Sequence, residues 1–246
     1  MPTRTLIVNA DDLGYDPAVT RGILEGMDRG IVSSATFMVN TPFSVEAAAV
    51  SKGRALGLHL NLARWATLSG RIPAQLLAGG ELIEANAGQL PADAVEAETL
   101  AQLDRFRELL GQDASHIDVH KHLHTHANVL EGLCAAARAR RLPVRSINAQ
   151  MRSALRERKV ATNDHFIGGA DGDAYWTVAQ LEAELGQLED GVTELMCHPG
   201  YAPTHVKSGY SVQREVELAT LTHPNAKAMV TRAGATLATF AAVRLP

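Results

Sequence analysis

Carboxylate and imidazole side chains stand at four places in the sequence where a short apolar run ends. Asp11 and Asp12 directly follow the run TLIVNA, and His59 lies in the segment GLHLNL. The segment DVHKHLH begins with Asp118, and the segment CHPG carries His198. Aspartate oxygens and histidine nitrogens are ordinary ligands of divalent cations, and the same residue types move protons in hydrolysis. These residues are therefore candidates for a hydrolytic site that holds a metal ion.

The two adjacent aspartates are expected to have different roles. A strand directs neighbouring side chains to opposite sides unless the strand has just ended, so one carboxylate can bind a metal while the other faces the reacting water. An Asp-Asp pair can also cap a helix. Asp16 fits the capping role better, because it precedes Pro17 and proline favours the first position of a helix.

In the segment DVHKHLH, an aspartate and three histidines are spaced by two residues. A strand would place all four side chains on one face, next to the site. A histidine-rich loop in solvent would explain the same spacing without any function. We expect His120, which is nearest the strand, to be a ligand, and His122 remains an open alternative. His124 and His126 are expected around the site or on the surface.

The remaining two histidines also have simple structural explanations. His59 points away from the leucines that flank it, which in a barrel can direct it into the site, unless it is a core histidine with its own partner. His198 precedes Pro199 and Gly200, a turn signal that leaves its ring available at a strand end. The alternative is a turn histidine without a partner.

Alternating short apolar runs and helical patterns must position these residues. Continuous apolar strands separated by helices are typical of a parallel sheet with right-handed crossovers. About seven such units in about 250 residues favour an α/β barrel, in which the carboxyl ends of the strands build the active site. We expect strands at 5–10, 34–39, 55–62, 117–120, 144–147, 164–167 and 191–197, and helices at 17–29, 43–51, 92–110, 129–140, 178–188 and 212–221.

Segment 64–91 interrupts this rhythm with glycine, proline and mixed polarity. A loop of this length is often a lid over a site, although a flexible surface excursion is equally compatible. The sequence shows no internal repeat, so residues 1–246 are predicted to form one domain. It also lacks a glycine-rich phosphate-binding motif after the first strand, so nucleotide binding has no support.

Composition excludes several classes of protein. Of the 246 residues, 46% are hydrophobic, and the net charge of −4 creates no field that attracts nucleic acid or an acidic membrane. The basic stretch 138–159 is predicted to be a solvated helix end and loop, with an anion or partner site as the alternative. Cys134 and Cys197 are expected to be buried reduced thiols. Without a signal peptide or a membrane span, a cytoplasmic location is expected.

Taken together, four motifs resemble those of the YdjC/ChbG family of carbohydrate N-deacetylases, in order and approximate spacing. They are NADDLG at 9–14, GLHLNL at 57–62, DVHKHLH at 118–124 and MCHPG at 196–200. The resemblance runs from residue 5 to about 222 and includes a late pattern, Arg214-Glu215-x-Glu217-Leu218. Leu13 and Val119 depart from the commoner Phe and Ser of the family. Neither departure removes a charged group.

The resemblance implies a distorted β/α barrel of the polysaccharide-deacetylase type that removes the N-acetyl group of a mono- or oligosaccharide and releases acetate. By motif, Asp12, His59 and His120 would bind a divalent cation, Mg²⁺ or Zn²⁺. Asp11 would be the general base, and His198 is expected to protonate the leaving amine. A homodimer is left open, and neither nucleic acid nor a membrane is an expected partner.

The chemistry of amide hydrolysis agrees with this set of residues. A bound cation lowers the pKa of water from 15.7 towards ~7, and a positioned imidazole can protonate the amine that leaves. Arg145 could pair with Asp11 or with a substrate oxygen, or form only a surface salt bridge. Two other classes remain as alternatives. One is a metal-dependent phosphoesterase or amidohydrolase on a similar barrel, and the other is a metal- or sugar-binding protein without turnover.

Overall fold

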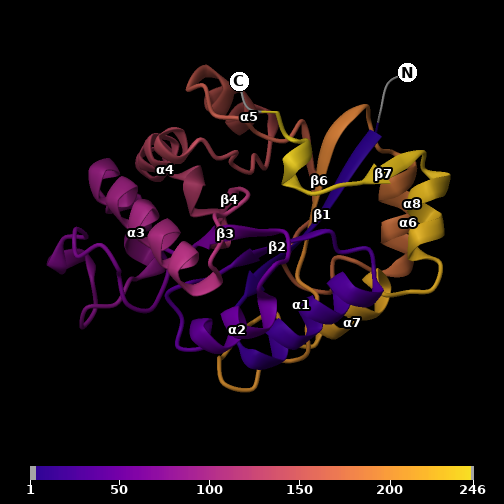
Figure 1. Cartoon of the computed structure of the whole chain (residues 1–246), viewed down its shortest axis with the longest axis horizontal. Helices are drawn as coiled ribbons and strands as arrows, with labels where there is room; N and C mark the ends of the chain where they lie inside the picture. Colours follow the sequence, from indigo (N-terminus) through magenta and orange to yellow (C-terminus); the bar gives the residue numbers. More distant parts are fainter. Residues whose placement is uncertain (1–3, 245–246) are drawn as a thin grey trace.

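Seven strands form one sheet in the part of the chain that the computed structural model describes, residues 4–244. Their pairings are parallel, in the order β4-β3-β2-β1-β6-β5, with β7 paired to β1. The first strand of the chain runs through the middle of the molecule (Figure 1). The strands are β1 (Arg4–Leu13), β2 (Ser34–Phe37), β3 (Leu56–Leu60), β4 (Ile117–Val119), β5 (His165–Ile167), β6 (Gly191–Cys197) and β7 (Ala235–Leu237).

Burial on both faces explains why β1 is central. Leu6, Ile7 and Val8 are all fully buried, as expected for a strand of a parallel sheet that is covered on both sides. β1 pairs with β6 from Arg4 to Ala10, whereas β7 pairs with its beginning and β2 with its end. The continuous apolar run therefore places the Asp11-Asp12 pair at the carboxyl end of the most central strand.

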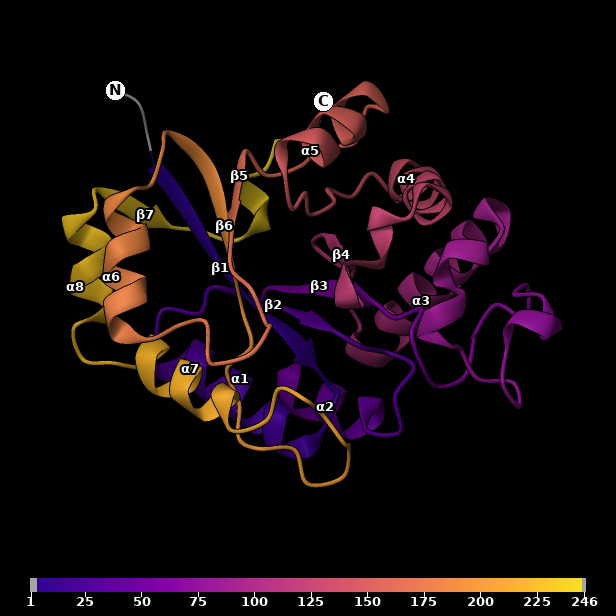
Figure 2. The ribbon, with the colours of Figure 1, turned by 180° about the vertical axis from the view of Figure 1, so that it is seen from behind.

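Helices cover the outside of the curled sheet. Seen from behind, α1, α2 and α7 lie along one side, and α6 and α8 lie together at another (Figure 2). α1 starts as predicted, with Pro17 as its first residue and the Asp16 carboxylate accepting a hydrogen bond from the Ala18 N–H at 2.8 Å. The helices are α1 (Pro17–Arg29), α2 (Ser44–Ser51), α3 (Ala92–Leu110), α4 (Ala127–Arg140), α5 (Ala149–Glu157), α6 (Val178–Gly186), α7 (Gln213–Leu221) and α8 (Ala226–Arg232).

Irregular segments fill the gap between the outer strands β4 and β5, so the barrel is distorted, as the family resemblance implies. Val144 forms a single parallel bridge with β4, and its N–H donates to the Ala161 carbonyl at 2.9 Å. Two residues further along both segments, the Asn163 side chain accepts from the Ser146 N–H at 2.8 Å and donates to the Ser146 carbonyl at 2.9 Å. The expected strand at 144–147 is therefore wrong, because a side-chain amide replaces the backbone ladder there.

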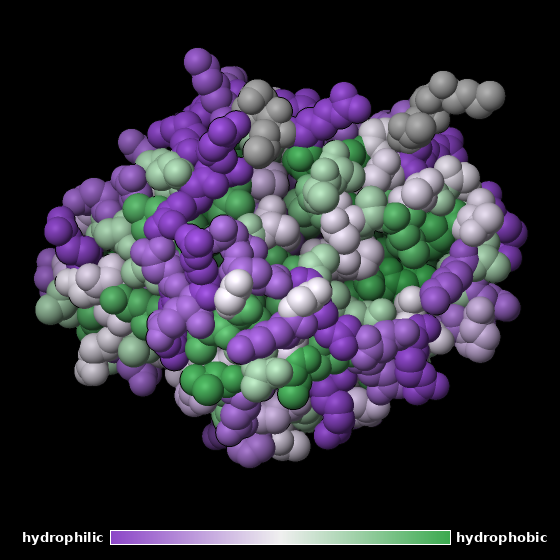
Figure 3. Space-filling model, viewed as in Figure 1, coloured by the Kyte–Doolittle hydropathy of each residue, from purple (hydrophilic) through white to green (hydrophobic). Residues whose placement is uncertain are grey.

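The basic stretch 138–159 is more ordered than expected. It contains α5, which the sequence patterns miss because only Met151 and Leu155 are buried in this helix. Most of its basic side chains are exposed, and hydrophilic residues cover the upper edge of the molecule where α5 lies (Figure 3). Arg145 is the exception, with 0% exposure. The predicted solvated surface therefore applies to the stretch without Arg145.

Segment 64–91 has some structure of its own. It contains two 3-10 helices, Ala74–Leu76 and Glu84–Gln89, and a short antiparallel bridge between Ala66 and Glu81. Leu82 is 4% exposed, so the segment packs on the body of the protein. Cys134 and Cys197 are free and buried. Within residues 4–244, no helix is both long and apolar enough to cross a membrane.

Candidate metal and hydrolytic site

The end of β1 separates the two aspartates by a change in the backbone. Asp12 has a φ of 72°, in the left-handed region, and the register with β2 shifts between Ala10 and Leu13. Such a conformation is rare for a residue other than glycine, and it occurs often at functional sites. The Arg214 Nη2 atom lies 2.6 Å from Asp12 Oδ2 and holds the carboxylate in place. The other oxygen, Oδ1, faces two histidines.

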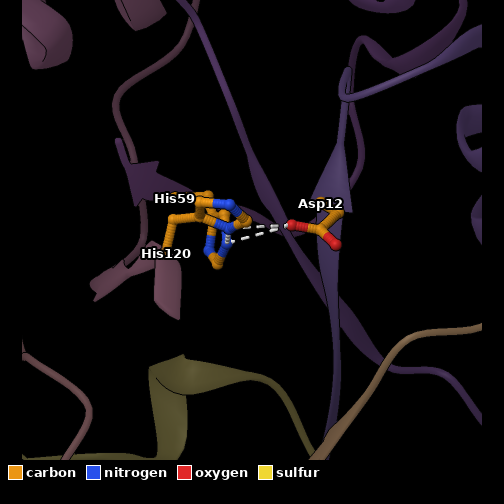
Figure 4. Close-up of side chains that lie close together, drawn as sticks. All are labelled: Asp12, His59 and His120. Carbon is orange, nitrogen blue, oxygen red and sulfur yellow. Dashed lines mark hydrogen bonds and ion pairs between the residues drawn. The ribbon is translucent and has the colours of Figure 1, made fainter. Parts of the chain in front are cut away.

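Asp12, His59 and His120, which we call the ligand trio, converge from β1, β3 and the turn after β4 (Figure 4). Asp12 Oδ1 is 3.3 Å from His59 Nε2 and 3.2 Å from His120 Nδ1, and the two nitrogens are 3.1 Å apart. Ligands about 2.0–2.2 Å from one ion are separated by about 3.0–3.4 Å. The trio therefore has the spacing of donors around a single cation.

A buried acceptor without a donor supports the same conclusion. Among residues 4–244, Asp12 Oδ1 makes no hydrogen bond of ordinary geometry and has only the two imidazole nitrogens of the trio beside it, although the side chain is only 4% exposed. Buried carboxylate oxygens nearly always have partners. Because one carboxylate oxygen and two imidazole nitrogens are common ligands of divalent ions, the residues present fit such a cation.

The turn that carries His120 differs from the sequence prediction. β4 ends at Val119, and a 3-10 turn, His120–Thr125, follows, in which Lys121 and His122 have left-handed φ values of 55° and 52°. The expectation of one shared strand face is therefore wrong, because the backbone reverses direction immediately after the strand. His122 borders the site cavity, and burial lowers its pKa to about 3. His124 is fully buried, so the surface position that the sequence allowed for it is wrong.

Beside the ligand trio, Arg145 binds three carboxylates: Asp11, Asp118 and Glu194. We call these four residues the arginine cluster. The Nη1 and Nη2 atoms of Arg145 are each 2.7 Å from an oxygen of Asp11. Nη2 also lies 2.8 Å from Asp118 Oδ2, and Nε donates to Glu194 at 2.7 Å. All four side chains are 3% exposed or less. Of the alternatives that the sequence left open for Arg145, the surface salt bridge is therefore wrong. The pairing with Asp11 is present.

Burial and charge act on these carboxylates in opposite directions. Burial alone would raise the pKa of Asp11, but the charge and hydrogen bonds of Arg145 hold this pKa well below its usual range. Burial raises the pKa of Glu194 to about 7, because the charge and hydrogen bond of Arg145 offset less of the desolvation at Glu194 than at Asp11. Asp11 is therefore ionised at every pH near neutrality.

His198 stands on the other side of Asp11. Its Nε2 atom is 4.0 Å from Asp11 Oδ2, and its backbone N–H donates to Glu217 Oε2 at 2.5 Å. Glu217 also accepts from the Tyr210 hydroxyl, so the loop carrying His198 is anchored to α7. Burial lowers the pKa of His198 to about 4, and the charges of Asp11 and Asp12 oppose this shift. The imidazole is neutral at pH 7 in this structure.

All five predicted site residues border one cavity of about 810 Å³. Arg64 and Glu84, from segment 64–91, line the same cavity, so this segment forms part of its wall. The Arg64 guanidinium donates to the Tyr15 hydroxyl at 3.0 Å and lies over the Trp65 ring. The five predicted site residues that border this cavity are Asp11, Asp12, His59, His120 and His198.

Several residues of the site carry no role in the sequence interpretation. Glu194 is a single acid in the apolar strand GVTELMC, a signal that could have identified it. Arg214 and Glu217 lie in the late motif, which shows their presence but not their contacts. Thr36 donates to Asp118 Oδ2 at 2.8 Å, and no sequence pattern indicates this contact.

Comparison with known proteins identifies relatives along nearly the whole chain. The sequence model of the family described as YdjC-like protein matches residues 5–232. A carbohydrate deacetylase of Geobacillus stearothermophilus is 37% identical over 246 residues, which cover 96% of this chain and 97% of that protein. A chitooligosaccharide deacetylase of Serratia marcescens is 34% identical over 249 residues, covering 96% and 98%.

Solved structures confirm the expected fold. An Enterococcus faecalis V583 protein, described as a proposed cellobiose-phosphate cleavage protein, superimposes with a TM-score of 0.86 at 27% identity and covers 97% of this chain and 98% of that one. A family 4 acetyl xylan esterase from Clostridium thermocellum superimposes with a TM-score of 0.53 at 13% identity, covering 97% and 89%. The curled parallel sheet is therefore that of the polysaccharide-deacetylase fold.

Proposed function

The chain belongs to the YdjC-like family, and we propose that it is a carbohydrate deacetylase that hydrolyses the N-acetyl group of a sugar and releases acetate. The observation that carries the proposal is the ligand trio directly beside the arginine-held Asp11 on one cavity wall. The deacetylase names of relatives at 37% and 34% identity support the same substrate class.

We propose Asp12, His59 and His120 as ligands of a divalent cation, Mg²⁺ or Zn²⁺. When bound, such a cation polarises the acetyl carbonyl and makes a water molecule acidic enough to attack near neutral pH. Arg214 restrains Asp12 through its second oxygen, so Oδ1 stays directed at the two imidazoles. The protein thus supplies three donors that need little rearrangement.

Asp11 is the proposed general base. Its carboxylate borders the cavity and is held on both oxygens by Arg145, which fixes its orientation. The low pKa weakens its basicity but keeps it ionised, so it is ready to accept the proton of the attacking water. A base positioned in this way typically contributes about 10²–10⁴-fold to the rate.

His198 is the proposed proton donor to the leaving nitrogen. Because its pKa is lowered to about 4, the imidazole must take up a proton during the reaction before it can donate one. Asp11 is the neighbouring group that gains a proton from water, and it lies 4.0 Å away. One proton can then pass from the water through Asp11 and His198 to the amine. The water oxygen stays with the acetyl carbon as acetate, so the reaction balances.

Acetate release from a panel of N-acetylated mono- and oligosaccharides tests the proposal. We expect release from at least one sugar, loss of release after treatment with a chelator, and recovery when Mg²⁺ or Zn²⁺ is added back. A parallel assay on sugar phosphates and simple phosphate esters separates the phosphoesterase alternative. Phosphate release without acetate release would overturn the proposal, and tight sugar binding without any turnover would favour a binding protein.

A further inference from the structure

Asp118 lies behind the ligand trio, and its two oxygens have different partners. Oδ1 is 2.7 Å from His59 Nδ1, on the side of the ring opposite to Asp12. Oδ2 is 2.8 Å from Arg145 Nη2 and accepts the hydroxyl of Thr36 at 2.8 Å. The side chain has 0% exposure, so these contacts replace water completely. Asp118 therefore contacts the ligand trio and Arg145 at once.

The contact with His59 determines which ring nitrogen can bind a cation. A neutral imidazole carries one proton, and the nitrogen without it has the lone pair that a metal needs. A proton on Nδ1 can be donated to the Asp118 carboxylate, which leaves Nε2 free toward Asp12 and His120. If the proton were on Nε2 instead, the lone pair of Nδ1 would face the negatively charged Asp118 oxygen, and the two would repel each other. The carboxylate of Asp118 therefore favours the tautomer that ligates through Nε2.

The second oxygen extends this restraint toward the proposed base. Arg145 Nη2 is shared between Asp118 Oδ2 at 2.8 Å and Asp11 Oδ1 at 2.7 Å. A rotation of the Asp118 carboxylate would change both the His59 ring and the guanidinium that holds Asp11. Carboxylates behind a metal-binding histidine commonly change metal affinity about 10–100-fold when they are replaced.

We propose that Asp118 is a positioning residue that fixes His59 in the Nε2-ligating tautomer and aligns it with the Arg145–Asp11 pair. The inference rests on the proposed metal site. It gives a role to a buried acid that contacts neither the reacting atoms nor the cation directly. The Asp118–His59 and Asp118–Arg145 distances are the observations on which it depends.

Replacement of Asp118 by Asn tests the inference, with Glu194→Gln as the matched control. Both changes remove one negative charge that contacts Arg145, but only Asp118 contacts His59. In titrations of the full chain with Co²⁺, we expect Asp118→Asn to raise the Kd about 10–100-fold. The control variant Glu194→Gln should change the Kd for Co²⁺ much less. Nuclear magnetic resonance of the Zn²⁺-loaded protein provides a second readout, in which the low-field Nδ1 proton of His59 should shift upfield only in Asp118→Asn.

The possible results separate this inference from the proposed function. Failure of the unaltered protein to bind Co²⁺ would overturn both. Normal binding by the unaltered protein and an equal Kd in Asp118→Asn, with an unshifted His59 proton, would overturn only the role of Asp118. Should Asp118→Asn fail to fold, Thr36→Val removes a hydroxyl that donates to Asp118 Oδ2 and also lies 3.3 Å from His59 Nδ1, and it should raise the Kd in the same direction by a smaller factor. No change in that variant would equally reject the role.

Discussion

The ligand trio and the arginine cluster are adjacent groups of buried charged residues, but their central atoms are partnered differently. In the described chain, Asp12 Oδ1 makes no hydrogen bond of ordinary geometry and has only the two imidazole nitrogens of the trio beside it. In the arginine cluster Glu194 Oε2 also lacks a partner, but Arg145 donates from all three of its nitrogens to carboxylates. A buried polar group without a partner is costly, so it marks a place where a ligand restores the balance. An arginine with a carboxylate at each of its nitrogens is a fixed support. The site thus combines a receptive part with a rigid part.

The charges of the two groups lead to the same distinction. With every acid ionised and every histidine neutral, four carboxylates and two guanidiniums leave a net charge of −2 in a buried volume. The structure offsets this charge with protons: Asp118 and Asp12 outweigh burial and raise the pKa of His59 to about 10, and burial raises that of Glu194 to about 7. A divalent cation supplies the same two positive charges. The counted groups are Asp11, Asp12, Asp118, Glu194, Arg145 and Arg214.

The sharpest test of the comparison replaces each of the two adjacent aspartates by Asn. Asp11→Asn should lower kcat/KM by about 10²–10⁴-fold while metal content stays the same, because it removes only the proposed proton acceptor. Asp12→Asn should lower metal content together with the rate. Metal analysis beside initial rates gives the answer: equal metal loss in both variants would refute the division, and loss only in Asp11→Asn would reverse it.

Stability measurements should distinguish the rigid part from the receptive part. Arg145→Met leaves three buried carboxylates without their cation, and we expect the free energy of unfolding to fall by about 3–5 kcal/mol. His120→Ala, in the ligand trio, should change the metal-free protein by less than about 1 kcal/mol, because the ring borders a cavity. Urea unfolding of the metal-free proteins measures both. Equal losses would show that the trio is as much a structural support as the arginine cluster.

The affinity for a cation should depend on pH through His59. In the metal-free protein its pKa lies above the ordinary value of 6.5, at about 10, so the ring is protonated at pH 7. Binding through Nε2 must displace that proton, and the Kd for Co²⁺ should fall about tenfold per pH unit between pH 6 and 8. Calorimetry in two buffers of different ionisation enthalpy counts the protons released. A Kd that is independent of pH would contradict the assignment of His59.

The smallest expected effect concerns the cavity wall formed by segment 64–91. Arg64→Ala removes a guanidinium that lines the cavity, and KM should rise about three- to tenfold, the range of one hydrogen bond. The turnover number should change little, since Arg64 contacts neither the ligand trio nor Asp11. Arg232→Ala, which breaks an exposed pair with Glu182, is the matched control. If both variants show the same KM, the segment is not part of the substrate site.

Local signals explain why much of the fold follows from the sequence. The Asp16-Pro17 start and the Gly111 stop delimit two helices, 17–29 and 92–110, that the structure shows with the same bounds. The strand 191–197 is also correct, because an apolar run between turn signals is unambiguous. α8 and β7 are missed, since both are short and carry little periodicity.

The site is less predictable, because its contacts join distant segments. The motifs predict that the ligand trio lies together, and the structure brings the three residues together. Their role as metal ligands stays a proposal. Arg145 and Asp11 are 134 positions apart, so the sequence could offer their pairing only as one of three alternatives. The turn after β4 is misread as strand, because alternating histidines imitate a strand and no glycine marks the left-handed residues Lys121 and His122.

The central place of β1 has a consequence for how the chain reaches this structure. Its neighbours β6 and β7 come from residues 191–197 and 235–237, so Arg4 pairs with both Gly191 and Ala235. Pairings between such distant segments slow folding, because a long loop must close before they form. As the chain is synthesised, β1 emerges before β6 and β7 and waits for them with apolar edges exposed, which favours aggregation or chaperone binding. Pulsed hydrogen exchange during refolding should therefore show the β1 amides protected late, at the same time as those of β6.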